Sequence, residues 1–361
     1  MPRWLFLILV IVLLQVMLWT FARTLRFIVF KEKNCIGLTW MLFIMGNGLL
    51  IISMTRVFPY LFIVLAWCLA LLWLWFMASV TGYILFRFAK IACPDYAALF
   101  LRAFIPLLFI SLVSWGMFNA YATVVRYYTV QLDKKMLPLR IGVASDIHLG
   151  AGFFFGACEL DKLVALMQAE KVDLILLPGD IINDNVVAYH KENMQPHLQA
   201  LHAPLGVYGT LGNHEFYGDA QENAQALRDA GVHLLRDAVT VVDNRVVIVG
   251  RDDDLHEQRP SLAALLRDVR HDLPIIVMDH RPTEIMQNVQ TAMDIQVSGH
   301  AHKGQIFPAN FITQALYTLH YGHKNIGEKE IFVTSGYGFW GVPLRIGSRS
   351  EIFIIDIQGK T

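Results

Sequence analysis

The chain has 361 residues, of which 55% are hydrophobic and 17% are charged, and its mean hydropathy is +0.45. An ordinary soluble domain is about 45–50% apolar and about 25% charged. The composition therefore excludes a disordered protein, a nucleic-acid-binding arm and a simple cytosolic enzyme. The formal net charge is zero, but residues 1–136 carry +9 and the rest carry −9, and all 13 histidines follow residue 147. The sequence thus has two unlike parts, an apolar, mildly basic first third and a polar, acidic, His-rich remainder.

Long apolar segments in the first third predict about four membrane spans. They cover residues 5–21, 36–54, 57–80 and 103–122. A helix of about 20 apolar residues crosses a hydrocarbon core about 30 Å thick. The alternative of core helices in a large soluble protein is disfavoured because the segments lack an amphipathic face, and a signal peptide is disfavoured because no cleavage site follows the first segment. The segments contain no charged residue, which favours an anchor or platform over a transport pathway.

Basic residues beside the spans predict an orientation. Four spans put both termini on one side of the membrane. The loops after the first and third spans hold seven Lys and Arg residues, against five on the other side. The positive-inside bias then places the C-terminal domain outside the cytoplasm. We therefore expect a multi-pass cell (inner) membrane protein with an extracytoplasmic catalytic domain.

From residue 137 onward, strand patterns alternate with helix patterns. Strands are expected at residues 139–145, 172–177, 207–211, 239–249, 275–278, 295–297, 331–334 and 352–355. Helices are expected near residues 159–168, 220–230, 261–269 and 282–289. This alternation predicts an α/β domain of roughly 220 residues, large enough for its own core. The expected organisation is a transmembrane region at 1–136 and an α/β domain at 137–361.

Five short polar clusters each follow a predicted strand. They are Asp146-Ile147-His148, Gly179-Asp180 with Asn183, Gly212-Asn213-His214-Glu215, Asp279-His280, and Gly299-His300-Ala301-His302. The carboxyl ends of strands in an α/β sheet meet at one edge, so clusters far apart in sequence can converge there. Imidazole, carboxylate and amide oxygen suit Mn, Fe or Zn, and the absence of thiolates excludes a structural Cys-rich zinc site. One such histidine alone would be an ordinary surface residue; five clusters in this order predict a metal centre.

This ordered set resembles the calcineurin-like metallophosphoesterases, whose pattern is D-x-H, G-D-x-x-D, G-N-H-[DE], H and G-H-x-H. The resemblance covers about residues 139–357. The segments 299–305 and 334–345 are similar to the membrane-associated bacterial branch that includes the YkuE-like phosphoesterases. The resemblance implies a four-layer fold of two mixed sheets flanked by helices. The expected fold is thus an N-terminal α-helical transmembrane bundle plus an α/β four-layer metallophosphoesterase sandwich.

The resemblance also implies two divalent metal ions per chain. The implied ligands of the first ion are Asp146, His148, Asp180 and His302, and those of the second are Asp180, Asn213, His280 and His300. Two such cations share a hydroxide that attacks phosphorus, and they neutralise charge on the phosphoryl oxygens. By the same resemblance, His214 is the catalytic residue that protonates or stabilises the departing oxygen.

Two positions depart from the family pattern. Asn183 stands where the family usually has Asp, which leaves open whether Asp184 or Glu215 supports His214 instead. Ala301 and Lys303 also differ from the related branch. Lys303 is a candidate ligand of the substrate phosphate, and its alternative role is that of an exposed loop residue. Arg251 and Arg281 are further candidates, because Arg suits bidentate phosphate binding.

Apolar segments beside the metal motifs bear on the substrate. Residues 153–155 and 307–321 are rich in Phe, Ile and Leu. They predict either a rim that meets the bilayer or an acyl chain, or side chains packed on the domain's own core or on the spans. We expect a membrane-anchored phosphoesterase acting on a phosphodiester, phosphomonoester or pyrophosphate of a lipid-linked substrate. A UDP-linked diacylglucosamine, cleaved by some members of the wider family, is one candidate.

Two alternatives are the same hydrolase acting on soluble nucleotides or phosphoesters, and a non-catalytic metal-binding module that binds a partner. The expected partners are the lipid bilayer and a phosphoester substrate, with no nucleic acid. The oligomeric state is left open by the sequence.

Overall fold

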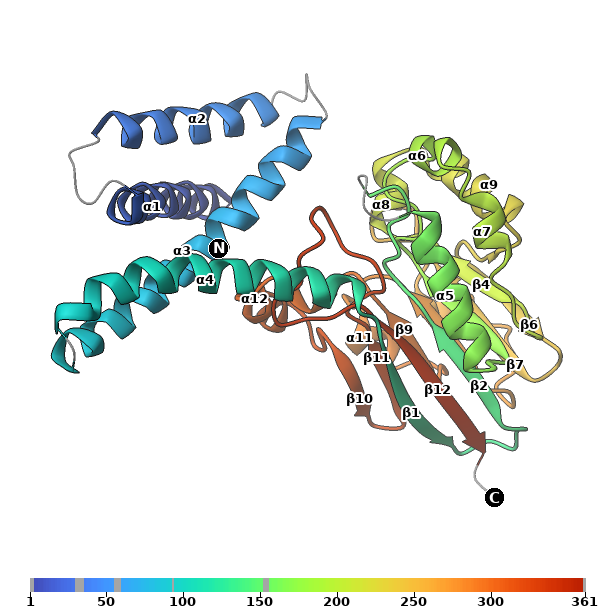
Figure 1. The fold of residues 1–361 in the computed structure, drawn as a ribbon. Coiled ribbons are helices and arrows are strands. Elements are labelled where there is room, and N and C mark those ends of the chain that lie inside the picture. The colour runs from blue at the N-terminus through green and yellow to red at the C-terminus, as the bar shows by residue number, and fades with distance from the viewer. Residues whose placement is uncertain (1–2, 30–35, 55–59, 93, 152–155, 360–361) are drawn as a thin grey trace. The chain divides into compact units, whose positions relative to one another are not determined.

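The computed structural model describes the chain except for residues 1–2, 30–35, 55–59, 93, 152–155 and 360–361. The chain forms two compact units, Met1–Met117 and Phe118–Thr361 (Figure 1). We call them the helical unit and the sheet unit. The apolar residues 153–155 of the sequence analysis lie outside the described residues.

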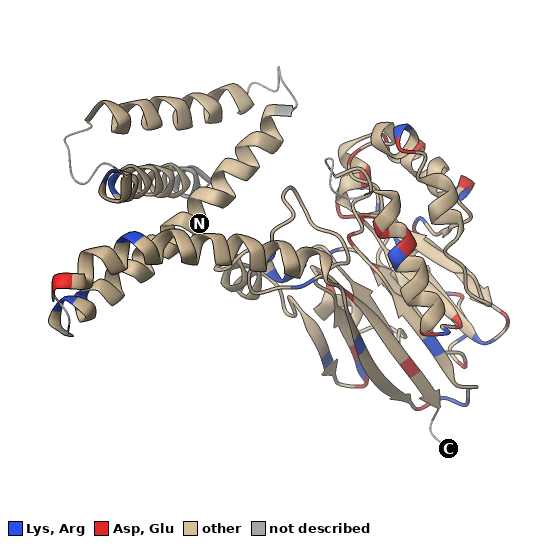
Figure 2. Cartoon of the chain, viewed as in Figure 1, with Lys and Arg blue, Asp and Glu red and all other residues tan. Residues whose placement is uncertain are grey.

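The helical unit contains the four long helices that the apolar segments predict. They are α1 (Arg3–Val29), α2 (Ile36–Met54), α3 (Tyr60–Ala92) and α4 (Pro94–Tyr121), the last of which ends in the sheet unit. Each is long and apolar enough to cross a membrane. Charged side chains are sparse along them (Figure 2). The helices α1 and α3 extend past the predicted apolar segments, because Arg, Leu and Lys at their ends are good helix formers.

Trp75 of α3 lies at the centre of the packing in the helical unit. Its indole N–H donates a hydrogen bond of 2.6 Å to the Thr24 hydroxyl of α1. Its ring meets Phe21 of α1 and Phe109 of α4 edge-on, with ring centroids 5.3 and 5.2 Å apart. Such aromatic pairs contribute about 0.5–1.5 kcal/mol beyond their buried area. These contacts join α1, α3 and α4 around one side chain.

Two mixed six-stranded sheets form the sheet unit. The first has the order β1 (Val124–Leu132), β12 (Glu351–Gly359), β2 (Leu139–Val143), β3 (Leu174–Pro178), β4 (Val207–Thr210) and β5 (His233–Leu234). The second has the order β10 (Gly322–Ile326), β11 (Lys329–Val333), β9 (Ile295–Ser298), β8 (Ile275–Asp279), β7 (Val246–Arg251) and β6 (Ala238–Val242). Strands β2, β3 and β4 run parallel, as do β7, β8 and β9.

The apolar side chains of the two sheets pack in three layers of core. Between the sheets, Ile141 and Phe353 of the first meet Ile248 and Ile276 of the second. The outer face of the first sheet is covered by α5 (Ala157–Ala169), α6 (Val187–Lys191), α7 (Gln195–Gln199) and α9 (Ala220–Asp229). The outer face of the second is covered by α10 (Leu262–Leu265) and α11 (Ile285–Asn288). The order helices, sheet, sheet, helices confirms the four-layer prediction.

One predicted strand is in fact a hairpin. The segment 239–249 was expected to be continuous, but β6 and β7 pair antiparallel with Val242 opposite Val246. The turn between them holds Asp243 and Asn244, both with φ of +49°. Asp and Asn tolerate this left-handed conformation and are common in turns, so the Asp-Asn pair was the signal for the break.

The boundary between the two parts lies earlier than the predicted 136/137. Strand β1 (Val124–Leu132) was assigned to the membrane region, but it pairs along its whole length with β12 and buries Val130 and Leu132. The Arg126 Nε also donates a 2.6 Å hydrogen bond to the fully buried Glu351. The strand follows a helix end directly, with only Ala122 and Thr123 between, so no break in composition marks its start.

This boundary predicts how truncated chains behave. A chain that begins at Phe118 retains β1 and should be soluble and folded. A chain that begins at Leu137 exposes the edge of β12 and leaves buried Glu351 without Arg126, so we expect it to aggregate. Soluble yield, size-exclusion chromatography and circular dichroism check this, and equal yields of folded protein from both chains would contradict it.

Candidate metal centre

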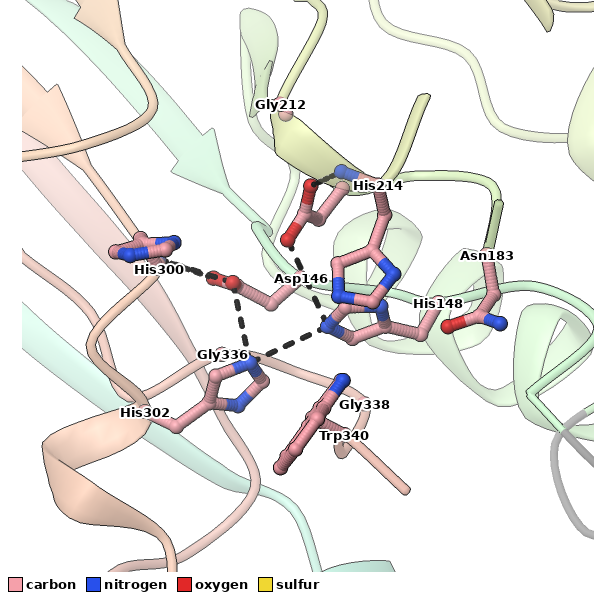
Figure 3. Close-up of polar contacts among 12 residues, drawn as sticks. Asp146, His148, Asn183, Gly212, His214, His300, His302, Gly336, Gly338 and Trp340 are labelled. Carbon is pink, nitrogen blue, oxygen red and sulfur yellow. Dashed lines mark hydrogen bonds and ion pairs between the residues drawn. The ribbon is translucent and has the colours of Figure 1, made fainter. Parts of the chain in front are cut away.

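The polar clusters converge at the carboxyl ends of parallel strands. Asp146 and Asp180 follow β2 and β3, and Asn213 follows β4 as the first residue of α8 (Asn213–Tyr217). In the second sheet, His280 follows β8 and His300 follows β9. Loops from both sheets thus meet at one place, as Figure 3 shows for part of the set.

Asp146, His148 and His302 form the first group of facing ligand atoms. The His148 Nε2 lies 3.2 Å from the His302 Nε2, and the His302 Nε2 lies 3.3 Å from an Asp146 carboxylate oxygen. A carboxylate oxygen of Asp180 lies 3.9 Å from the His148 Nε2. All four side chains are buried. The residues that the sequence assigned to the first ion therefore lie together.

Asp180, His280 and His300 form a second group. The Asp180 Oδ2 lies 3.1 Å from the His280 Nε2 and 3.9 Å from the His148 Nε2 of the first group, so Asp180 lies between the two groups. Beside it, the Asn213 Oδ1 is buried, and no donor among the described residues reaches it. A buried amide oxygen is nearly always hydrogen-bonded, and a metal ion would satisfy this one. The donor set of imidazole, carboxylate and amide oxygen thus fits two borderline divalent ions.

The backbone that presents these ligands is strained. Asp146, His148, Asp180, His300 and His302 all have positive φ, between +45° and +66°. Residues other than glycine rarely adopt this conformation, and it persists where surrounding contacts impose it. Here the His300 N–H donates to the Asp146 carboxylate at 2.9 Å, which joins the loops after β2 and β9.

Two glycines leave the space that two of the ligand carboxylates occupy. A Cβ at Gly212 would overlap the Asp180 carboxylate, and one at Gly299 would overlap the Asp146 carboxylate. Both glycines were noted in the sequence next to the ligand residues. Their role is to leave room for the ligand of a neighbouring loop.

Burial sets the protonation of the cluster. It lowers the pKa of His148 and His300 to about 3 and that of His302 well below its ordinary value, so these rings are neutral at pH 7. Burial would raise the pKa of Asp180, but the facing His280 holds it well below its usual range. Burial would lower the pKa of His280, but the facing Asp180 raises it to about 10, so this ring must lose a proton to bind a metal ion, whereas the other three rings are already in the neutral form that binds one.

His214 is supported by the residue next to the expected one. Its Nδ1 lies 2.7 Å from an Asp184 carboxylate oxygen. Asn183 forms no hydrogen bond with His214 (Figure 3) and instead donates to the other Asp184 oxygen at 3.4 Å. Asp184 therefore supports His214 in place of the Asp that the family usually has at position 183. It is one of the two alternatives raised from the sequence. Burial would lower the pKa of His214, but the Asp184 hydrogen bond and the nearby Asp180 raise it above its ordinary value.

Glu215, the other alternative, has a different role. Its buried carboxylate accepts hydrogen bonds from the backbone N–H groups of Ile181, Ile182 and Gly212, at 2.6–2.8 Å. It also accepts from the Asp180 N–H at 3.1 Å. Glu215 therefore fixes the two loops that carry Asp180 and Asn213.

Arg251, Arg281 and Lys303, the candidate phosphate ligands, have other partners. Arg251 is 1% exposed, and its Nη1 lies 2.8 Å from both Asp279 and Glu284. The Arg281 Nε donates to Asp253 at 2.7 Å. The Lys303 ammonium lies 4.2 Å from the centre of the Tyr321 ring. None of the three lines the cleft over the metal ligands in the part of the chain that the structure describes.

Arg345 is a site residue that the sequence analysis missed. It is fully buried, and its Nη2 donates to the carbonyl oxygens of Ser335, Gly336 and Gly338 behind His302. The segment 334–345 was quoted only for its resemblance. The available signal was an Arg at the end of a Gly-rich segment, because a buried guanidinium requires several hydrogen-bond acceptors.

A cleft of about 350 Å³ opens over the ligands. Its floor includes Asp180, Asn213 and His214. Its rim includes Trp340 and Thr313, which lies on α12 (Ala309–Leu316). Gln305 fixes Trp340 through two backbone hydrogen bonds of 2.8 and 2.9 Å. The cleft can hold a phosphoryl group and part of what it is bonded to.

Comparisons with known proteins agree with this site. Residues 139–304 match the calcineurin-like phosphoesterase family. An uncharacterised metallophosphoesterase of Aquifex aeolicus is 30% identical over 251 residues, which are 67% of this chain and 94% of that protein. The uncharacterised metallophosphoesterase YkuE of Bacillus subtilis is 28% identical over 59% of this chain and 77% of its own length. A transmembrane protein with metallophosphoesterase domain from Danio rerio is 29% identical over 68% of this chain and 60% of its length.

The family match covers the strands and loops that carry the candidate ligands, from Asp146 to His302. The matches confirm the resemblance drawn from the five polar clusters, the YkuE-like relatives included. The chain belongs to the calcineurin-like metallophosphoesterase family and is a metal-dependent phosphoesterase.

Proposed function

We propose that the chain is a membrane-anchored enzyme that hydrolyses a phosphodiester, phosphomonoester or pyrophosphate bond with two divalent ions. The observation that carries this proposal is the place of Asp180 between His148 of the first group and His280 of the second, beside the buried Asn213 Oδ1, which has no hydrogen-bond partner among the described residues. Asp146, His148, Asp180 and His302 would hold one ion, and Asp180, Asn213, His280 and His300 the other. Such a pair of ions, of Mn, Fe or Zn, supplies a water of lowered pKa and neutralises charge on the phosphoryl oxygens.

His214 is the general acid in this proposal. Its Nδ1 is held by Asp184, and its ring lines the cleft beside Asp180. The ring therefore offers its other nitrogen to the cleft, where a departing oxygen needs a proton. Asp184 holds the orientation of the ring and favours its protonated form. Asp184 is thus a positioning residue, and His214 is the catalytic one.

The apolar surface beside the cleft favours a lipid-linked substrate. Thr313 of α12 lines the cleft, while Phe311, Ile312 and Leu316 of the same helix are 56–69% exposed. Trp340, on the rim, is 51% exposed. Exposed side chains of this size next to a polar site are suited to an acyl chain or a bilayer surface. A soluble nucleotide or phosphoester would leave this surface without a role.

Membrane anchoring and topology are part of the proposal. They are supported by the four apolar helices and by the relative whose name describes a transmembrane protein. The charge bias of the loops supports a sheet unit outside the cytoplasm.

The first prediction concerns metal dependence. Metal-free protein should not hydrolyse bis-p-nitrophenyl phosphate, and refilling with Mn²⁺, Fe²⁺ or Zn²⁺ should restore turnover. Asn213→Ala removes one ligand of the second ion, so we expect its turnover to fall by at least tenfold. Release of p-nitrophenol measures this. A folded, metal-loaded protein without turnover on any phosphoester would support the non-catalytic module instead.

A second prediction separates Asp184 from Asn183. Asp184→Ala should slow hydrolysis of a phenyl ester by about 10–100-fold and that of a p-nitrophenyl ester much less, because a good leaving group needs little protonation. Asn183→Ala, which removes only a 3.4 Å hydrogen bond to Asp184, is the matched control and should change both rates far less. Values of kcat for the two esters check this, and equal losses on both esters would show that Asp184 has only a structural role.

A third prediction tests the lipid-linked substrate. The double variant Ile312→Ser/Leu316→Ser should lower kcat/KM on a UDP-linked diacylglucosamine in mixed micelles by at least tenfold, because the apolar contact is lost. Its activity on bis-p-nitrophenyl phosphate should not change. Met286→Ser, at a residue 50% exposed on α11, is the control. An unchanged kcat/KM on the lipid-linked substrate would favour soluble phosphoesters.

A further inference from the structure

A groove runs between three helices of the helical unit. It has a volume of about 740 Å³ and is lined by residues of α1, α3 and α4, among them Trp19, Arg23, Arg26, Ser79, Val80 and Ile105. The helices α3 and α4 approach closely beside it. A Cβ at Gly82 would lie 2.8 Å from the Ile105 side chain, which is closer than real Cβ contacts.

The groove combines apolar walls with two arginines that lack a carboxylate partner. The Arg23 guanidinium lies 5.1 Å from the centre of the Trp19 ring, and the Arg26 Nε lies 3.4 Å from the Ala22 carbonyl oxygen. Neither forms an ion pair with any residue that the structure describes. In the described part of the helical unit, Asp95 is the only acidic residue. Among the described residues, the charge of this groove is therefore positive and has no compensating carboxylate.

Ser79 adds a second, independent sign of a ligand. It is 3% exposed, lines the groove, and its hydroxyl has no hydrogen-bond partner among the described residues. A buried hydroxyl without a partner destabilises a protein, because it has lost its hydrogen bonds to water and gained none in return. An acceptor oxygen placed in the groove would remove this cost.

We infer that the groove binds one anionic phospholipid of the bilayer. Its phosphate pairs with Arg23 and Arg26, because guanidinium groups form strong, bidentate hydrogen bonds with phosphate. An ester or phosphate oxygen accepts from the Ser79 hydroxyl, and an acyl chain lies along Val80 and Ile105. The apolar walls select a lipid over free phosphate. This inference rests on the membrane anchoring proposed above, and it assigns a site separate from the metal centre.

Native mass spectrometry of the full chain in detergent tests this site. With phosphatidylglycerol and phosphatidylcholine offered together, we expect one phosphatidylglycerol retained per chain. Excess inorganic phosphate should not displace it. The double variant Arg23→Gln/Arg26→Gln should lower this retention at least tenfold. Arg87→Gln, which removes an exposed charge of α3 outside the lining, should leave it unchanged. Equal retention of the two lipids, displacement by phosphate, or unchanged retention by the double variant would overturn the inference.

A milder variant and a second readout keep the result interpretable. Ser79→Ala keeps both charges and nearly the same shape, so it should fold normally and weaken lipid retention several-fold; unchanged retention would overturn the inference. Hydrolysis of bis-p-nitrophenyl phosphate, measured on the same samples, should be equal in all variants. If the wild type hydrolyses the ester but retains no phosphatidylglycerol, the lipid site is overturned and the proposed function is not. A full chain that stays monodisperse without detergent would overturn the membrane anchoring on which the inference rests.

Discussion

Asp180 is a fully buried carboxylate, and much of the site is arranged around it. One of its oxygens faces His280, and the other accepts the backbone N–H of His214. Glu215 fixes the loop that carries it, and Gly212 leaves room for it. An ionised carboxylate at this depth requires positive charge nearby. Two divalent ions held by the two ligand groups would meet that requirement.

The cleft over the ligands combines the candidate metal centre with a surface for the substrate. The floor of the cleft is built from rigid strand ends, so the ligand atoms are held before a substrate arrives. The rim is built from α12 and from the segment behind His302, which Arg345 fixes. The polar floor and the apolar rim of the cleft are therefore formed by different elements of the chain. The proposed lipid-linked phosphoester would fit both at once, and the long apolar helices would bring the enzyme to the bilayer where such molecules lie.

The sequence predicted most of the fold and the convergence of the polar clusters because both leave short-range signals. Fully buried strands such as β3 and β8 are continuous apolar runs, and each ligand cluster directly follows its strand. The features that it missed or left open depend on distant contacts. Strand β1 is defined by its pairing with β12, which lies more than 200 residues away in the chain. The partners of Arg251 and the support of His214 by Asp184 were fixed by side-chain directions that no local pattern contains.

The most direct test of this account is the number of metal ions bound by the full chain. After refilling with Mn²⁺ and removal of excess metal, elemental analysis should find two ions per chain in the wild type. Asp180→Asn should bind less than one, because it weakens a ligand common to both sites. Folded wild-type protein that binds one ion or none would contradict the shared-ligand centre on which the proposed function depends.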